Sequence, residues 1–99
     1  MIAQNYVFKE DIAVVAPGTV ILALPVVIRD MTIMIEDASV VVVNLSDTAA
    51  AYDSTYKIKK VVLNGPQTVH LEFPKGLKCS TGLCAIANNG SADIAVTYD

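Results

Sequence analysis

Cys79 and Cys84 are the residues of this sequence whose types and spacing best suit local chemistry. They flank a short segment that contains Gly82, so the two thiols could close a disulfide if their Cα atoms come within about 7 Å. They could equally be small buried hydrophobic side chains, as free cysteines often are. A redox motif would have two intervening residues beside a helix N-terminus, and this spacing is different. In a chain made in a cytosol we expect reduced thiols.

His70 is the only histidine, and no known catalytic motif surrounds it. In an expected strand, His70 lies on the polar face, and its neighbours Val69 and Leu71 lie on the opposite, apolar face. This position is typical of a solvated side chain. A structural zinc site takes four ligands, and a single histidine without a nearby cluster of thiols or carboxylates does not supply them. The chain has no G-x-S-x-G turn and no glycine-rich phosphate loop. We therefore expect a protein that is not an enzyme and has no metal site and no cofactor.

Two small groups of charged residues lie between residues 47 and 60. Asp47 and Asp53 could hold calcium only if backbone carbonyls supplied most ligands, because the D-x-D-x-D-G spacing is absent. We expect a solvated turn there. Lys57 and Lys59 would share one strand face and Lys60 the opposite one, unless a bulge intervenes. Lysines often protect a sheet edge from stray pairing, and the alternative role is contact with an acidic patch on a partner protein.

The chain of 99 residues suits a single domain, residues 1–99, and it is unusually apolar. Its hydrophobic content is 54% when the 4 Tyr are counted as hydrophobic and the 5 Gly are not. Typical proteins are about 45–50% apolar when Gly is counted and Tyr is not, and by that count this chain is about 55% apolar. This excess argues against disorder and predicts more apolar side chains than one small core can cover. The net charge of −3 does not suit electrostatic binding of nucleic acid. The longest apolar run, residues 20–28, is too short to cross a bilayer.

Short runs rich in Val, Ile, Thr and Tyr, separated by Gly, Pro, Asn and Asp, predict an all-β protein. Alternation of polar and apolar residues within the runs indicates antiparallel strands with one dry face. We expect an antiparallel, jelly-roll-like β-sandwich or a small barrel, with seven to nine strands after some runs fuse. Residues 1–10 could form an extended N-terminal arm. The expected strands are residues 6–9, 12–15, 19–24, 26–29, 31–35, 39–45, 55–63, 68–73, 83–87 and 94–98.

Two segments are apolar on both faces: residues 20–28, apart from Pro25, and residues 40–43. A strand with two apolar faces lies either under a covering element or in a contact between subunits. No helix is expected here that could cover it. Shielding by a long loop or by the N-terminal arm is the alternative. The interface residues predicted on this basis are Val20, Leu22, Leu24, Val26, Ile28, Val40 and Val42.

The C-terminal half of the sequence contains four short pieces in a set order. These are Pro74-Lys75-Gly76, Gly82-Leu83 opening a strand, Asn89-Gly90 in a polar turn, and Val96-Thr97-Tyr98 ending a strand. In this order they resemble the closing strands of small β-sandwich structural proteins of tailed bacteriophages. Cys79 and Cys84 are not part of the resemblance.

The resemblance implies a non-enzymatic part of a phage virion: a head decoration or cement protein, or a small component of a neck, tail or fibre. The expected partners are further copies, with a trimer favoured because capsids present local threefold axes, and the major capsid protein or another virion protein. Nucleic acid and membranes are not expected partners. Because no secretion signal is visible, we expect assembly in the host cytoplasm. The alternative is a receptor- or carbohydrate-binding module with a groove lined by Tyr6, Tyr52 or Tyr56, although no Trp is present to stack on a sugar.

Overall fold

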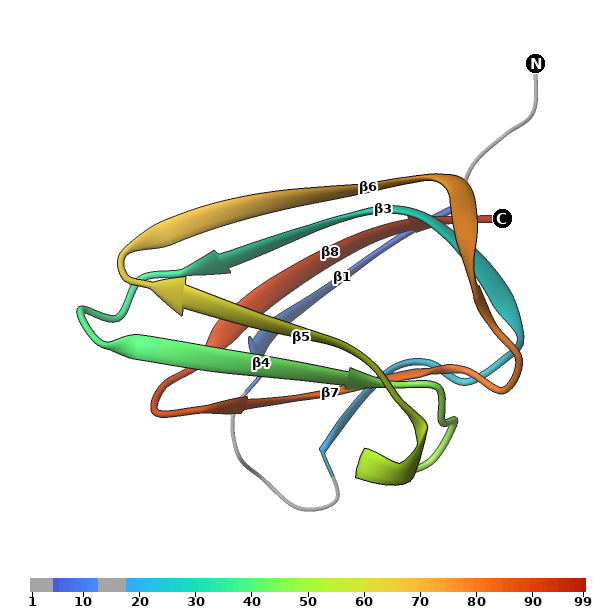
Figure 1. The fold of residues 1–99 in the computed structure, drawn as a ribbon, viewed down its shortest axis with the longest axis horizontal. Helices are drawn as coiled ribbons and strands as arrows, with labels where there is room; N and C mark the ends of the chain where they lie inside the picture. The colour runs from blue at the N-terminus through green and yellow to red at the C-terminus, as the bar shows by residue number, and fades with distance from the viewer. Residues whose placement is uncertain (1–4, 13–17) are drawn as a thin grey trace.

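The computed structural model describes residues 5–12 and 18–99, which form two β-sheets of four strands each (Figure 1). One turn of 3-10 helix, η1 (Ser54–Tyr56), is the only helical element among these residues. Within the same residues, no helix has the length and hydrophobicity that a membrane span requires. The strands are β1 (Asn5–Ile12), β2 (Thr19–Leu22), β3 (Val26–Ile35), β4 (Val40–Ser46), β5 (Lys57–Asn64), β6 (Gln67–Cys79), β7 (Leu83–Asn88) and β8 (Ala92–Tyr98).

The two sheets pack face to face as a β-sandwich and do not close into a barrel. The first sheet has the strand order β1-β8-β3-β6 and the second has the order β2-β7-β4-β5. All paired strands are antiparallel. The predicted all-β class and antiparallel sandwich are confirmed, with eight strands in the described part of the chain, and the barrel alternative is wrong.

Aliphatic side chains from alternate strand positions fill the space between the sheets. Successive residues of a strand point to opposite faces, so every second residue of a central strand enters the core. The outer faces carry the residues in between. The fully buried core residues of the two strands β3 and β4 are Ile28, Met31, Ile33, Val41, Val43 and Leu45.

The two long sides of the sandwich are bordered by different pairs of edge strands. β1 and β2 contact each other along one side. β5 and β6 lie along the other side and diverge from the turn at Gly65-Pro66 into different sheets (Figure 1). The N–H of Asn64 donates a hydrogen bond to the side-chain oxygen of Gln67 across this turn, over 2.8 Å. No strand pairing joins β5 to β6, and we call this side of the sandwich the open side.

β6 is longer than the sequence predicts because a bulge carries the strand past Pro74. On β3, Asp30 pairs with Glu72 of β6, but Ile28, only two residues earlier on β3, pairs with Leu77 of β6. Residues 73–76 form the bulge, and bulges bend the strand that carries them. The last part of β6 consequently turns toward the second sheet and closes one end of the open side (Figure 1).

Further segments differ from the predicted strands, among them the expected strand 19–24, which ends at Leu22. β3 joins the runs 26–29 and 31–35 into one strand. Residues 55–56 belong to η1 and not to the strand that follows. Of the expected strand 12–15, Ile12 ends β1 and residues 13–15 lie outside the described residues. Of the expected N-terminal arm, residues 5–10 lie in β1, which pairs with β8, and residues 1–4 are outside the described residues.

Candidate functional site on the edge strand β5

A group of exposed valines lies on the outer face of the second sheet. Val42 of β4 is the direct partner of Val62 of β5, and Val40 lies two residues along the same face. Val40 and Val62 are 43% and 56% exposed, whereas the inward-facing Val41 is fully buried. We call Val40, Val42 and Val62 the valine patch. The sequence predicted two of its members as interface residues and missed Val62, although Val61-Val62 makes β5 apolar on both faces as well.

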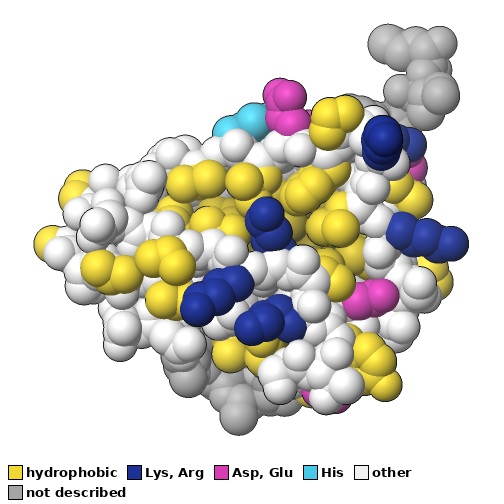
Figure 2. Space-filling model, viewed as in Figure 1, with side chains coloured by type: hydrophobic (Ala, Val, Ile, Leu, Met, Phe, Trp, Pro, Cys, Tyr) yellow, Lys and Arg dark blue, Asp and Glu magenta, His cyan; other side chains and the backbone are white. Residues whose placement is uncertain are grey.

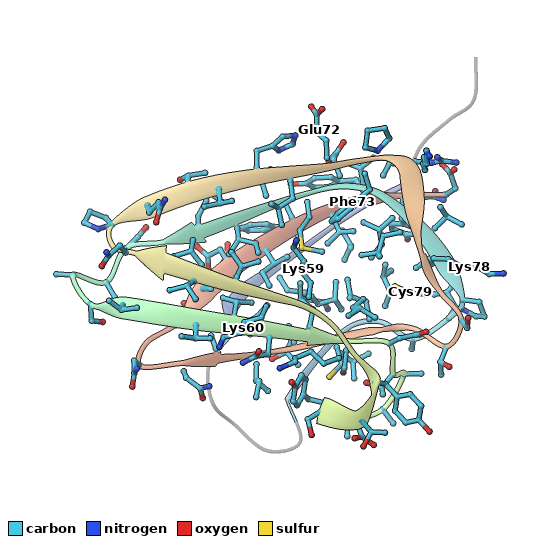
Figure 3. The ribbon with its side chains drawn as sticks, viewed as in Figure 1. Lys59, Lys60, Glu72, Phe73, Lys78 and Cys79 are labelled. Carbon is cyan, nitrogen blue, oxygen red and sulfur yellow. The ribbon has the colours of Figure 1, made fainter. Side chains whose placement is uncertain are left out.

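The three lysines of β5 lie on both sides of the strand, and a bulge at Ile58 decides the side of Lys57. The register with β4 passes over Ile58, so the alternation of faces shifts by one residue. Lys57 and Lys60 therefore share the outer face with the valine patch, and Lys59 is directed to the open side. Figure 3 shows Lys59 extending from β5 toward β6 and Lys60 on the side of β5 nearer β4. Without the bulge, Lys57 would have shared its face with Lys59.

Partly buried hydrophobic residues lie along the open side between β5 and β6. Ile58 on β5 and Val69, Leu71 and Phe73 on β6 are partly buried and pack against the core. We call these four residues the open flank. Hydrophobic side chains are visible between the two strands in Figure 2, with a lysine among them. The aliphatic stem of Lys59 can cover part of this surface while its ammonium group remains in water.

The other predicted interface residues lie in and around β2 and β3. Leu22, Val26 and Ile28 are buried in the core between the sheets. Their apolar character is thus accounted for by the folding of a single chain. The two remaining residues are Val20, half-buried on β2, and Leu24, exposed in the bend between β2 and β3.

A hollow of about 540 Å³ lies at the loop between β4 and β5. Tyr52 and Tyr56 both line it, together with Thr48 and Thr81. The third tyrosine predicted for a ligand groove, Tyr6, lies on β1 in the other sheet. The structure therefore brings together two of the three tyrosines.

The carboxylate of Asp47, which also borders this hollow, holds the turn between β6 and β7. It accepts hydrogen bonds from the backbone N–H groups of Ser80, Thr81 and Gly82 over 2.9, 2.8 and 3.2 Å. Burial raises the pKa of Asp47, but these three hydrogen bonds outweigh it and leave the pKa below its usual value. Asp53 caps η1 with its own carboxylate. Both carboxylates thus have structural contacts within the chain.

Cys79 and Cys84 are free thiols and both are buried. Burial, and to a smaller extent the negative charge of Asp47, raise the pKa of Cys79 to about 11. Burial also raises the pKa of Cys84, against hydrogen bonds from the N–H of Ala85 and the hydroxyl of Thr48. Because the thiolate is the nucleophilic form, neither residue is activated for chemistry at neutral pH.

His70 lies on the outer face of the first sheet, on the polar side that the sequence predicts. Its Nδ1 atom is 2.8 Å from the hydroxyl oxygen of Thr32, and its Nε2 atom is 3.6 Å from a carboxylate oxygen of Glu72. Among residues 5–12 and 18–99, no group of three or more His, Cys, Asp and Glu side chains is placed to hold a metal ion.

The valine patch, the β5 lysines and the open flank all lie on or beside β5: Lys57, Lys60 and Val62 are on its outer face, and Ile58 and Lys59 are next to the open side. This surface combines exposed apolar groups, positive charge and the edge of a sheet. We take it as the candidate functional site, and its arrangement suits contact with another protein. Comparisons of the chain with protein-family models, with curated proteins and with solved structures find no match.

Proposed function

We propose that this protein is a non-enzymatic structural protein of a tailed-phage virion, which oligomerises and binds the head lattice as a decoration or cement protein. The surface around β5 is the observation that carries this proposal. Valines that remain exposed on a rigid sheet, beside lysines, can bury apolar area against a partner, while the charges restrict which partner fits. In this proposal the partners are further copies of the chain, as a trimer, and the major capsid protein.

The assignment to a phage virion rests on the resemblance in the C-terminal half of the sequence. Its four pieces lie in the bulge of β6, at the start of β7, in the turn before β8 and at the end of β8. This is the order of strands and turns that the resemblance implies, and it supports the proposal. Assembly of such a protein takes place in the host cytoplasm, followed by residence in the virion.

The proposal is tested by measuring the native mass and the binding to capsid shells of the phage that encodes the chain. We expect a trimer or larger species and co-sedimentation with the shells. Val62→Asp places a charge in the valine patch and should abolish this binding. Leu24→Asp is the matched control, because it changes an exposed aliphatic residue outside the β5 surface. A protein that stays monomeric at high concentration and does not bind shells would overturn the proposal. Loss of binding in L24D but not in V62D would show that the docking face is not the surface around β5.

A receptor- or carbohydrate-binding module is the second candidate, favoured by the hollow that Tyr52 and Tyr56 line. Aromatic rings beside hydroxyl groups provide both stacking surface and hydrogen bonds for a sugar. A glycan array probed with the wild-type protein tests this function. Binding that is lost in Tyr56→Ala and retained in Tyr6→Ala would support it, and an array without any bound glycan would contradict it.

A further inference from the structure

β1 and β5 are the two edge strands best suited to extend a sheet. Each is the terminal strand of its sheet among the described residues, each has eight residues, and they lie in different sheets on opposite sides of the sandwich. The other two edges are protected. β2 has four residues in the described part of the chain, and β6 carries Pro74 and Lys75 in its bulge, features that hinder pairing with another strand. β1 and β5 also contain bulges, at residues 10–11 and at Ile58, but these leave residues 5–9 and 59–64 regular.

The exposed hydrophobic side chains concentrate on these two edges. Six large hydrophobic residues are exposed in the described part of the chain, and three of them, Tyr6, Phe8 and Val62, lie on β1 or β5. A fourth, Val40, belongs to the valine patch beside β5. Tyr6 and Phe8 alternate with the inward-facing Val7, so they occupy the outer face of the first sheet. An edge that carries exposed aromatic residues is unusual for a strand that remains unpaired.

The charges of the two strands are complementary. β5 begins with Lys57, Lys59 and Lys60, whereas the last four residues of β1 contain two carboxylates and one lysine: Lys9, Glu10, Asp11 and Ile12. A second β5 strand would offer these lysines no partner of opposite charge, because β5 contains no Asp or Glu. A β1 strand placed antiparallel to β5 would instead bring its acidic end to the lysines.

We infer that copies of this chain associate by strand addition, with β1 of one copy paired antiparallel to β5 of the next. The inference rests on the self-association in the proposed function and identifies the contact. In the register that pairs Val62 with Phe8, Lys60 pairs with Glu10, and the outer-face residues of both strands lie on one side. The second sheet of one copy then continues into the first sheet of its neighbour. Such a head-to-tail contact closes into a ring or extends into a filament, according to the rotation between copies.

Disulfide trapping between Val62→Cys and Phe8→Cys tests the pairing directly. The two variants are mixed and oxidised with glutathione disulfide, which takes up the two electrons and two protons released when the intermolecular S–S bond forms. We expect a covalent dimer in the mixture and none with either variant alone. A mixture of Tyr56→Cys and Phe8→Cys is the control, since Tyr56 is exposed but precedes β5. Covalent dimers of V62C alone or of F8C alone would show pairing of like strands and overturn the inference.

A charge exchange tests the same contact without cysteines. Lys60→Glu and Glu10→Lys should each weaken association about tenfold, because each replaces an attractive pair by a repulsive one. The double variant should recover most of the wild-type affinity. Circular dichroism verifies that all three variants fold, as expected for exposed positions. Equal affinities of the four proteins would overturn the inference.

The two proposals fail in different ways. Oligomers in native mass measurements, without a disulfide in the V62C and F8C mixture, would remove the β1–β5 contact and leave the structural function standing. A monomer at every concentration, again without a disulfide in the mixture, would remove both.

Discussion

Asp47 connects the end of β4 to the turn after β6 through three backbone N–H groups. Asp47→Ala removes the acceptor from all three groups, so we expect the free energy of unfolding to fall by about 1–3 kcal/mol. Urea unfolding followed by circular dichroism measures the change. Glu36→Ala is the control, because Glu36 is an exposed carboxylate and its loss should change stability by less than about 0.5 kcal/mol.

The effect of Asp47 should also depend on pH in a defined direction. The pKa of this carboxyl in the folded protein lies below its ordinary value of 3.8, so folding favours the ionised form. Its stabilising contribution is therefore complete above the unfolded pKa and is lost as the pH falls through the folded pKa. Unfolding of the wild type and of D47A should differ most at neutral pH and less well below pH 3.8. A difference that grows on acidification would contradict this assignment.

The two cysteines should be unreactive in the folded protein. With a pKa of about 11, Cys79 carries very little thiolate at neutral pH, and the pKa of Cys84 is raised as well. We expect alkylation by iodoacetamide to be at least about a hundredfold slower than for a free cysteine with a pKa near 8.5. Mass spectrometry of native and urea-unfolded samples measures the two rates. Rapid labelling of the native protein would show that the thiols are accessible.

At the scale of elements, the bulge of β6 depends on the conformation of Gly76. Its φ angle is 78°, and a Cβ atom there would lie 2.4 Å from Cγ1 of Val27. Gly76→Ala should therefore lower the free energy of unfolding by about 1–3 kcal/mol, because a side chain is strained in this conformation. Lys75→Ala changes an exposed residue of the same bulge and should have little effect. Chemical denaturation of both variants tests the difference, and equal stabilities would contradict it.

The sequence predicts elements well wherever side chains alternate regularly. The alternation in β8 and in the first half of β6 defines their faces, and both strands form as predicted. It fails where an irregular backbone decides the outcome. Pro74 indicates the end of a strand, but β6 continues because a bulge accommodates the proline. The bulge at Ile58 likewise redirects Lys57, and no pattern in the run of lysines reveals where the extra residue lies.

At the scale of the whole molecule, part of the candidate site follows from the sequence. Val40 and Val42 are predicted to face a partner because β4 is apolar on both sides, and both lie on the outer face. The run from residue 20 to residue 28 has the same composition but passes through two strands and the bend between them, so four of its nine residues fill the core. Composition alone cannot separate these cases, because the bend between β2 and β3 decides which side chains face inward.

Association of the copies should weaken as the salt concentration rises. The proposed contact places Lys60 of one copy near Glu10 of another at an exposed edge, where ions screen the attraction. Between about 0.05 M and about 0.5 M NaCl, where the screening length falls from roughly 14 Å to roughly 4 Å, we expect the average mass to decrease. Light scattering at constant protein concentration measures it. An average mass that increases with salt would indicate a contact dominated by apolar burial.

The bulge and the proline of β6 affect how an array of copies could grow. With β2 short and β6 blocked, each molecule would offer one donor edge and one acceptor edge, so a row of molecules would have a polarity and two unlike ends. A variant with a blocked β1, such as a proline at position 7, would still pair through its β5 with the free β1 at one end of a row, but no further copy would add there. A variant with a blocked β5 and an intact β1 would stop growth at the opposite end in the same way, so small amounts of either variant would shorten the rows.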